Sequence, residues 1–419
     1  EPVGSRLKEK VHHPAYPCRE VNGIIFAYLG SGEPPLLPSY EFLAVPEPQR
    51  FVTKYHHDCN YLQGNEGNDT YNLMIEGTMR LSFNYGADQA PFTRLVLNMS
   101  TGVVSNDGLG CTDQLNILGN NGRVEIRGTD HVDTMIGSDG RESFITERGD
   151  DYVDGGLGYD RVRYDRSGVD YVNVDLEGQT ASGIWDGLAF TDTLVDIEWI
   201  RGSRYGNDTL AGDDEGNTLQ AYGGNDFLDG GTEADDIDGG DGDDVVNGLA
   251  GDDILAGGNG VDIVSGGLGN DLLTGSGNGV TETFYAQRST GQTVLFNFYF
   301  GSLNEPWTDD FEIDYLYGGD GNDTIWAMPL DVADGGDGTG DRVIANFYGH
   351  SQGLNLDLTV NAQSLLAAEL GATLSGFELF SVWGTRFDDV VTGDEGANEI
   401  YGRDGDDTLN GGGGNDILY

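Results

Sequence analysis

The sequence contains few cysteines, few basic residues and no long apolar run. Its three cysteines, Cys18, Cys59 and Cys111, make neither a disulfide framework nor the spacing of a zinc site. No apolar run is long enough to cross a bilayer, so no transmembrane segment is predicted. The 21 Lys and Arg residues face 72 Asp and Glu residues, which gives a formal net charge of −51. A chain this acidic repels nucleic acid and anionic membranes, so neither is an expected partner.

An initiating methionine and a secretory signal peptide are also missing. The last glycine-rich stretch runs up to Tyr419, and we therefore expect the chain to be a piece of a longer protein. Proline is scarce except near the N-terminus, where seven of the 11 prolines precede Glu47. This change of composition predicts a separate N-terminal segment over residues 1–66, which includes a short β-hairpin.

Glycine is abundant, with 68 residues, and much of it recurs with a period of nine. Written nine residues to a row, residues 203–274 form eight rows with no insertion. Column eight is aliphatic in every row, and column six is Asp in all rows except one. A strict period of nine predicts a repeat architecture in which each row is a glycine-rich turn followed by a short strand. In that strand the aliphatic side chain points inward and its neighbours point outward.

Two rows then form one coil, and the coils stack. The fold class predicted is all-β, a right-handed parallel β-roll or β-solenoid. Stacked strands lie about 4.8 Å apart, so the column-six carboxylates form a ladder at that spacing. Two charges at this distance repel by roughly 1 kcal/mol in water and by more at a lower dielectric. Such a ladder requires a counter-ion, and carboxylate and carbonyl oxygens are the ligands that calcium prefers.

The rows beginning at Gly239 and Gly266 match the pattern G-G-x-G-x-D-x-U-x at every fixed position, where U is a large aliphatic residue. The repeat therefore resembles the hemolysin-type, repeats-in-toxin (RTX) calcium-binding nonapeptide. The resemblance implies several bound Ca²⁺ ions and folding driven by calcium, at about 10⁻⁴ to 10⁻³ M. It also implies a secreted or cell-surface bacterial protein, exported unfolded by type I secretion machinery whose signal would lie beyond Tyr419.

The metal ligands predicted are column-six aspartates and the carbonyl groups of glycines in the turns. They are Gly155, Gly158, Asp160, Asp208, Gly224, Asp226, Asp235, Gly239, Gly242, Asp244, Gly248, Gly251, Asp253, Gly257, Gly260, Asp262, Gly266, Gly269, Asp271, Gly318, Gly321, Asp323, Asp389, Gly402, Gly405, Asp407, Gly411, Gly414 and Asp416.

Outside the eight rows a larger unit recurs three times. Each copy is an alternating strand, a less regular stretch, a second strand and then nonapeptides, which we interpret as coils of one solenoid with decorated turns. Ile184, Trp185, Trp199, Phe377, Phe380 and Trp383 are expected to thicken or cap the thin core. The predicted modules are residues 67–163 (rows 128–163), 164–280 (rows 203–274), 281–353 (an aromatic insert, with rows resuming at Asp309 and Gly318 and a degenerate row from Gly335) and 354–419 (rows 384–419).

Residues 1–66 carry a second resemblance. The stretch RLKEKVHHPAYPCREVNGIIFAYLGSGEPP, with KYHHDCNYLQGNEGN, resembles Rieske-type ring-hydroxylating oxygenases of the phthalate dioxygenase kind. That family holds its iron–sulfur cluster with C-x-H and C-x-x-H, and neither pattern occurs in this chain. Its catalytic iron requires an Asp and two His soon after N-x-E-G-N, whereas here no His follows Asn65 before His131. This segment is therefore interpreted as an oxygenase-like fragment without metal ligands.

Two features leave other functions open. Residues 349–353, GHSQG, match the nucleophile elbow of lipases and esterases, but an elbow needs a helix directly after it and the internal repeat predicts a strand there. The aromatic insert is expected to be a coil or a side-packed hairpin, or alternatively an exposed face for a glycan or protein ligand. A secreted hydrolase, an adhesin and a non-functional oxygenase remnant are thus the alternatives to a calcium-binding module. No catalytic residue and no organic cofactor site is predicted.

Overall fold

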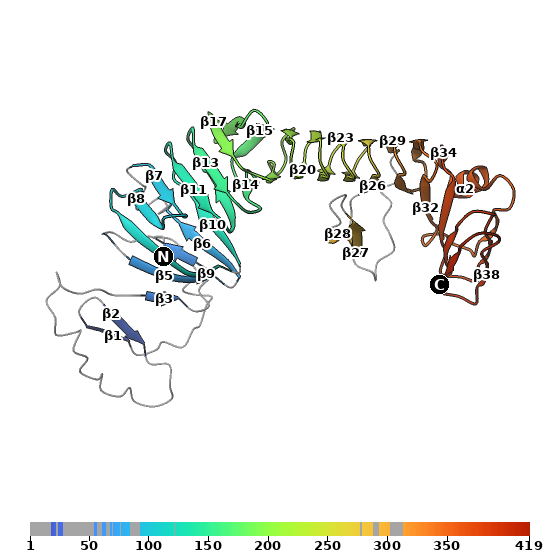
Figure 1. Cartoon of the computed structure of the whole chain (residues 1–419), viewed down its shortest axis with the longest axis horizontal. Helices are drawn as coiled ribbons and strands as arrows, with labels where there is room; N and C mark the ends of the chain where they lie inside the picture. The colour runs from blue at the N-terminus through green and yellow to red at the C-terminus, as the bar shows by residue number, and fades with distance from the viewer. Residues whose placement is uncertain are drawn as a thin grey trace, which may run out of the picture. The chain divides into compact units, whose positions relative to one another are not determined.

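The chain divides into two compact units, Glu1–Lys54 and Tyr55–Tyr419 (Figure 1). The computed structural model describes residues 18–21, 24–27, 54–56, 61–63, 68, 70–75, 77–83, 93–120, 122–276, 279–287, 293–301 and 313–419. In the first unit, β1 (Cys18–Val21) pairs antiparallel with β2 (Ile24–Ala27), which confirms the N-terminal hairpin. Most of the oxygenase-like fragment lies outside the described residues. Strand β3 (Lys54–His56) spans the point in the sequence where the units divide.

The second unit contains a parallel sheet of 15 strands, here called the first sheet. Its strands follow the order of the sequence, so each coil adds one strand. They are β4 (Tyr61–Gln63), β6 (Thr78–Ser82), β10 (Arg123–Arg127), β12 (Arg141–Ile145), β14 (Arg161–Arg163), β18 (Trp199–Arg201), β20 (Thr218–Gly223), β22 (Asp236–Asp241), β24 (Ile254–Asn259), β26 (Leu272–Ser276), β30 (Thr324–Ala327), β32 (Arg342–Asn346), β35 (Leu379–Trp383), β37 (Glu399–Tyr401) and β39 (Ile417–Leu418).

The alternate strands of the coils form the second sheet. They are β7 (Leu95–Asn98), β11 (Thr134–Ser138), β13 (Tyr152–Gly156), β17 (Leu188–Val195), β19 (Thr209–Ala211), β21 (Phe227–Gly231), β23 (Val245–Ala250), β25 (Ile263–Leu268), β29 (Tyr315–Asp320), β31 (Val332–Asp337) and β34 (Thr373–Ser375). From β19 to β34 each strand pairs in parallel with the next in this list. Near the C-terminus, β33 (Asn355–Asp357), β36 (Val390–Thr392) and β38 (Thr408–Asn410) form a third parallel sheet.

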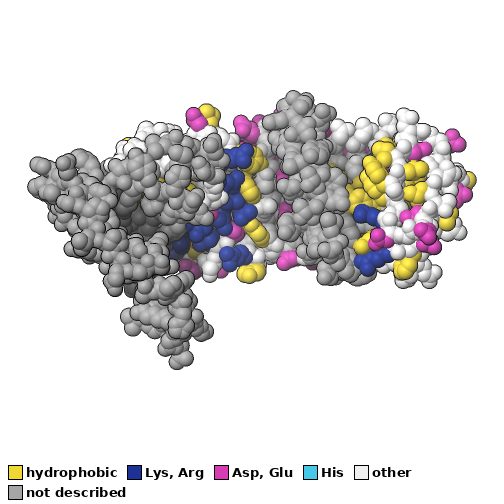
Figure 2. Space-filling view, turned by 90° about the horizontal axis from the view of Figure 1, so that it is seen from below, with side chains coloured by type: hydrophobic (Ala, Val, Ile, Leu, Met, Phe, Trp, Pro, Cys, Tyr) yellow, Lys and Arg dark blue, Asp and Glu magenta, His cyan; other side chains and the backbone are white. Residues whose placement is uncertain are grey.

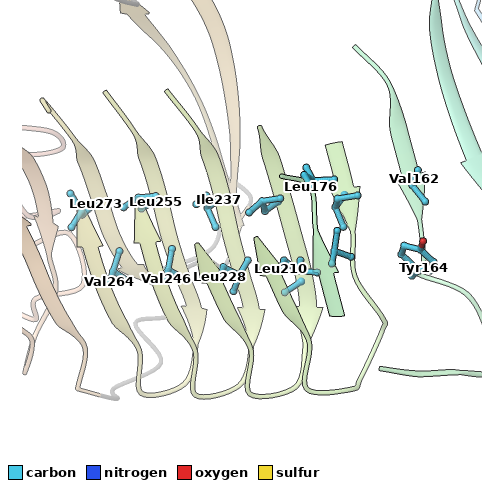
Figure 3. Close-up of a cluster of buried hydrophobic side chains, with 14 of the residues drawn as sticks. Val162, Tyr164, Leu176, Leu210, Leu228, Ile237, Val246, Leu255, Val264 and Leu273 are labelled. Atoms are coloured by element: carbon cyan, nitrogen blue, oxygen red, sulfur yellow. The ribbon is translucent and has the colours of Figure 1, made fainter. Parts of the chain in front are cut away.

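The register of these sheets is 18 residues, which confirms that two nonapeptide rows form one coil. Leu210 pairs with Leu228 on one sheet, and Leu219 pairs with Ile237 on the other. The column-eight side chains point between the sheets in two facing rows (Figure 3). All eight are fully buried: Leu210, Leu219, Leu228, Ile237, Val246, Leu255, Val264 and Leu273. The core of the repeat region is therefore one aliphatic side chain thick from each sheet.

The predicted decorated turns are present, but their structures differ between the three copies. In the first copy, β7 pairs antiparallel with β8 (Val103–Asp107), which pairs with β9 (Asp113–Asn120); β9 also pairs in parallel with β5 (Thr70–Ile75). In the second copy, β15 (Val169–Asp175), β16 (Thr180–Trp185) and β17 form the same antiparallel arrangement. Both copies thus insert a hairpin-like excursion into the second sheet.

The third copy contains a helix, α2 (Ala362–Leu370), which the sequence analysis did not predict. Asn361 at its start and Gly371 at its end both adopt left-handed backbone conformations, with φ of 55° and 76°. The N–H of Gly371 donates to the carbonyl of Ala367, which closes the last turn. Leu366 and Leu370 are buried in the main core. A run rich in Ala and Leu favours a helix, and the periodicity of the repeat concealed that local preference.

Residues 277–312 interrupt a single row without ending the roll. Strand β25 pairs directly with β29, and β26 pairs directly with β30, so the coils stack across the insertion. Gly275 lies beside the carboxylate of Asp314, as column-one glycines lie beside their aspartates elsewhere. The interrupted row therefore begins at Gly275, which corrects the expected start at Asp309. Within the insert, β27 (Gly279–Gln287) and β28 (Thr293–Gly301) form an antiparallel hairpin whose side chains lie outside the description.

Larger side chains thicken the core on both sides of the eight rows. Trp185, Phe377 and Phe380 are buried in the main core, as expected, and Ile184 is half-buried. Trp383 is buried in a separate cluster with Trp326 and Ile344. Trp199 is half-buried among arginine side chains, so it does not thicken the core. Next to the first of the eight rows, the Phe190 ring packs against both Tyr164, at 5.6 Å between ring centroids, and Trp185, at 6.4 Å. These aromatic rings widen the core where the eight rows begin, and the same core continues into the preceding coils.

Candidate calcium sites

Each column-six aspartate of the roll is tied to the next coil through one oxygen. The backbone N–H of Asp226 donates to Oδ1 of Asp244 at 2.7 Å, and that of Asp244 donates to Oδ1 of Asp262 at 2.8 Å. On the opposite edge, the N–H of Asp253 donates to Oδ1 of Asp271 at 2.9 Å. The pattern repeats every 18 residues and continues across the insert to Asp314 and Asp323. We call these two series the carboxylate ladders.

The second oxygen of many ladder aspartates is buried without a hydrogen-bond partner among the described residues. This holds for Oδ2 of Asp151, Asp160, Asp226, Asp244, Asp253, Asp271, Asp323 and Asp341. An unsatisfied buried polar atom costs about 1–3 kcal/mol, and a charged group costs more. Neighbouring carboxylates of a ladder repel one another, as the spacing of the repeat predicted. In addition, these oxygens have no hydrogen-bond donor among the described residues. A cation would satisfy both requirements.

Backbone carbonyl groups face the same places as these orphaned oxygens. A Cβ built on Gly248 would lie 2.2 Å from Oδ2 of Asp253 and 2.6 Å from the carbonyl oxygen of Gly266. A Cβ on Gly318 would lie 2.3 Å from both Oδ2 of Asp323 and the carbonyl oxygen of Gly335. Only glycine leaves this space open, so carboxylate and carbonyl oxygens converge there. Such an all-oxygen surrounding fits Ca²⁺.

The predicted column-one glycines lie next to their aspartates throughout the repeat region. The Oδ2 atom of the same row comes within 2.2–2.9 Å of the position of a Cβ at Gly155, Gly239, Gly248, Gly257, Gly266, Gly318, Gly402 and Gly411. The predicted column-four glycines have positive φ between 96° and 149°: Gly158, Gly224, Gly242, Gly251, Gly260, Gly269, Gly321, Gly405 and Gly414. Asp407 and Asp416, in the last two rows, are only half-buried.

Two predicted ligands differ from the others because the protein already satisfies both of their oxygens. Oδ2 of Asp208 accepts the N–H of Ser203 at 2.6 Å, and Oδ1 accepts the N–H of Val172 at 2.7 Å. Oδ2 of Asp389 accepts the N–H of Thr385 at 2.7 Å, and its Oδ1 accepts the Thr385 hydroxyl at 2.8 Å. These two carboxylates do not need a cation to complete their hydrogen bonding.

The residue that follows the small residue at the start of the turn separates the two kinds of row. In the Asp208 row Ser203 follows Gly202, and in the Asp389 row Thr385 follows Gly384; the N–H of each donates to the carboxylate. In the rows of Asp226 and Asp253 the corresponding residues, Tyr222 after Ala221 and Leu249 after Gly248, have positive φ of 78° and 75°. In most other rows a positive-φ glycine takes this place, as at Gly240 and Gly267. A Ser or Thr at this position was a signal in the sequence that the nonapeptide pattern alone did not use.

Among the residues that the structure describes, no three His, Cys, Asp or Glu side chains come close enough together to hold a metal ion. Each row offers one inward carboxylate, so further calcium ligands would be backbone carbonyls from neighbouring coils. This agrees with the composition of the repeat, in which glycine rather than acid fills most of the turn.

Burial raises the pKa of the orphaned carboxyls. The pKa of Asp226 and of Asp244 is raised to about 7, and that of Asp271 to about 8. The neighbouring ladder aspartates raise these pKa values further, while the backbone N–H donors lower them. A carboxyl group with such a pKa exchanges its proton for another cation near neutral pH.

These pKa values predict how pH acts on the roll when calcium is absent. An unfolded Asp has a pKa of about 3.9, so protonation stabilises the fold fully below about pH 4. This stabilisation is lost as the pH rises through about 7 to 8. We expect the calcium-free chain to keep more β signal at about pH 5 than at about pH 8, and to show a cooperative melt only at the lower pH. Calcium affinity should rise over the same pH range. Thermal melts followed by circular dichroism test this, and pH-independent melts would contradict it.

The nucleophile-elbow pattern does not occur in an elbow structure. Ser351 is exposed, and residues 349–353 are followed by strand β33, which begins at Asn355. Helix α2 begins only at Ala362. An elbow places its serine between a strand and a helix that follows directly, so this segment is a connection between coils, as the internal repeat predicted.

The fold and the ladders define a class of protein, a parallel β-roll of nonapeptides with oxygen-lined turns. Comparison with known families agrees: the model of the RTX calcium-binding nonapeptide repeat (4 copies) matches residues 117–162, 204–237, 238–273, 311–328 and 383–418. The chain therefore carries RTX calcium-binding repeats and forms a calcium-binding β-roll module. Among the described residues, no helix is both long and apolar enough to span a membrane.

The chain is also similar, over a short stretch, to a protein of a different kind, an oxygenase subunit. The chain is 38% identical over 65 residues to the oxygenase subunit of tert-butanol monooxygenase / tert-amyl alcohol desaturase from Aquincola tertiaricarbonis. The match covers 15% of this chain and 14% of that protein. It is consistent with the resemblance of residues 1–66 to Rieske-type oxygenases, and the chain spans about one seventh of the length of that relative.

Proposed function

We propose that this chain is the calcium-dependent β-roll region of a secreted or cell-surface bacterial protein. In the cytosol, where free calcium is low, the ladder carboxylates would lack their counter-ion and the roll would stay unfolded. Outside the cell, calcium at about 10⁻⁴ to 10⁻³ M would fold it. Export in an unfolded state by a type I system follows from this switch, and a linked functional domain would gain a folded, extended support.

The observation that carries this proposal is the set of orphaned Oδ2 atoms beside glycine carbonyls. They recur on both ladders, from Asp151 to Asp341, and in most rows a glycine of the turn lies beside the orphaned oxygen. A roll designed to fold without metal would give these oxygens donors, as it does at Asp208 and Asp389. We therefore propose that rows with an orphaned Oδ2 bind calcium, and that the Asp208 and Asp389 rows do not.

A pair of substitutions in one row tests this proposal. Asp253→Asn keeps Oδ1 as the acceptor for the N–H of Asp235, at 2.9 Å, but removes the charge that faces the proposed ion. We expect the calcium midpoint for folding to rise roughly threefold or more, since calcium affinity depends on the charge of the ligand set. The chain should also bind at least one ion fewer at saturation.

Asp252→Asn is the matched control, because it makes the same charge change one residue away. Asp252 points outward and accepts a hydrogen bond from the N–H of Asn270, at 2.9 Å, which an Asn oxygen can also accept. Calorimetry would give the midpoint and the number of ions for both variants. Equal behaviour of the two variants would show that bulk acidity, rather than the ladder, binds calcium.

A further inference from the structure

An arginine cluster lies on the outward face of the first sheet, away from the ladders. Arg123, Arg161 and Arg201 come from β10, β14 and β18, and their guanidinium carbons lie 4.8, 4.5 and 5.1 Å from the centre of the Trp199 ring. Arg141 is the direct neighbour of Arg123 in the sheet register. Basic side chains gather visibly on this face (Figure 2). The cluster is notable because the whole chain has only 21 basic residues against 72 acidic ones.

These guanidinium groups have few acidic partners. Arg201 lies 3.8 Å from Asp165, but Asp165 is already bound by Arg163 at 2.8 Å. Among the described residues, no carboxylate is within ion-pair distance of Arg123, Arg141 or Arg161, although eight such pairs form elsewhere or at the margin of the cluster. One terminal nitrogen of Arg123, Nη1, is buried and has no hydrogen-bond partner within the described part of the chain.

Packing these like charges together has an electrostatic cost. The guanidinium carbons of Arg123, Arg161 and Arg201 all lie within 5.1 Å of the centre of one indole ring, so their positive charges repel one another. The pKa of Arg123 is lowered by burial, by Arg141 and by Arg201. A protein with a surplus of 51 negative charges has ample carboxylates that could neutralise such a cluster. Among the described residues, none of them forms an ion pair with Arg123 or Arg161, and the carboxylate beside Arg201 is shared with Arg163, so much of the positive charge of the cluster is open to an external anion.

The cluster is also held in place. The indole N–H of Trp199 donates to Oε1 of Gln220 at 3.2 Å, and Nε of Arg201 donates to the same oxygen at 3.2 Å. Nε of Arg161 donates to the hydroxyl of Ser143 at 3.0 Å. These bonds use Nε and leave the terminal nitrogens available, which is the side of a guanidinium that binds planar oxyanions in a bidentate manner.

We propose that the arginine cluster is an oxyanion-binding site, in which Arg123, Arg161 and Arg201 hold a carboxylate, sulfate or phosphate group beside Trp199. The anion would supply the acceptor that Arg123 Nη1 lacks and would screen the repulsion among the three guanidinium groups. The half-buried positions of Arg123, Arg201 and Trp199, together with the exposed Arg141, give a small anion access from solvent. This site uses no calcium ligand, although Arg161 directly follows the ladder residue Asp160 in the sequence.

The test is a titration of the calcium-loaded full chain with sodium sulfate, with sodium chloride at matched ionic strength as the reference. We expect a saturable change in tryptophan fluorescence with a Kd on the order of 1 mM, because Trp199 contacts the groups that bind. Arg123→Gln and Arg161→Gln should each weaken binding about tenfold or more. Arg403→Gln is the matched control. The guanidinium carbon of Arg403 lies 4.3 Å from the centre of the Trp383 ring, and among the described residues no second arginine stacks on that ring.

The outcomes separate a binding site from a structural stack. Sulfate binding that is equal in the wild type and in both cluster variants, or no effect beyond that of chloride, would overturn the proposal. If Arg161→Gln fails to fold, Arg123→Gln alone decides, because Arg123 is the more exposed of the two. Titration with glucuronate against glucose then distinguishes the source of the anion. Tighter binding of glucuronate than of sulfate would support an acidic sugar, and binding of sulfate alone would support a free inorganic anion.

Discussion

Removal of calcium with EDTA at about pH 8 is expected to abolish most of the β signal of the repeat region. At this pH, above the raised pKa values of Asp226 and Asp244 and near that of Asp271, most of these buried carboxyls carry a charge that neither a proton nor a metal compensates. Six orphaned oxygens between Asp226 and Asp341, at about 1–3 kcal/mol each, destabilise the roll by roughly 6–18 kcal/mol. This destabilisation is comparable to the whole free energy of unfolding of an ordinary domain, about 5–15 kcal/mol.

Far-UV circular dichroism during a calcium titration measures this effect. We expect a cooperative gain of β signal with a midpoint at about 10⁻⁴ to 10⁻³ M, because each ion bridges adjacent coils and helps the next coil to form. Magnesium is the control ion, since it retains its water and requires a smaller octahedral site. A full β signal in EDTA, or an equal response to magnesium, would contradict calcium-dependent folding.

Gly242→Ala is expected to produce the second large effect, although it changes neither a charge nor a proposed side-chain ligand. Gly242 has φ of 136°, and a Cβ there would lie 1.7 Å from the carbonyl oxygen of Gly224 in the coil before it. A side chain in this backbone region costs about 1–3 kcal/mol, and the clash with a backbone atom adds to that. These two coils would have to separate, which would also break the bond from the N–H of Gly224 to the carbonyl of Asp241, at 2.8 Å.

Gly349→Ala provides the matched control for this substitution. The φ of Gly349 lies outside the left-handed region, and no heavy atom lies within 4 Å of the place where its Cβ would be. We expect Gly349→Ala to leave the calcium midpoint unchanged and Gly242→Ala to raise it several-fold or to prevent folding. If both variants folded at the same calcium concentration, the close stacking of successive turns would not limit stability.

The period of nine was enough to predict the all-β roll, its 18-residue coil and its buried column of aliphatic residues. This succeeded because in a solenoid each row meets only its neighbours, so a local pattern also specifies the long-range contacts. The start of the row at Gly275 was not predicted, since the 277–312 insertion hides the continuity between Gly275 and Asp314. Helix α2 was missed for a similar reason: a decorated turn is free to follow local preference.

The candidate sites divide in the same way. The residue types and their spacing by themselves determined that oxygen ligands gather at the turns, that calcium is the metal they suit and that the core is thin. Only the tertiary structure decided which carboxylates remain without a donor, because that depends on the backbone direction at the start of each turn, as at Ser203 and Tyr222. It also decided that arginines from β10, β14 and β18, up to 78 positions apart in the sequence, meet around Trp199. Such a meeting depends on how strands stack, which no spacing along the chain expresses.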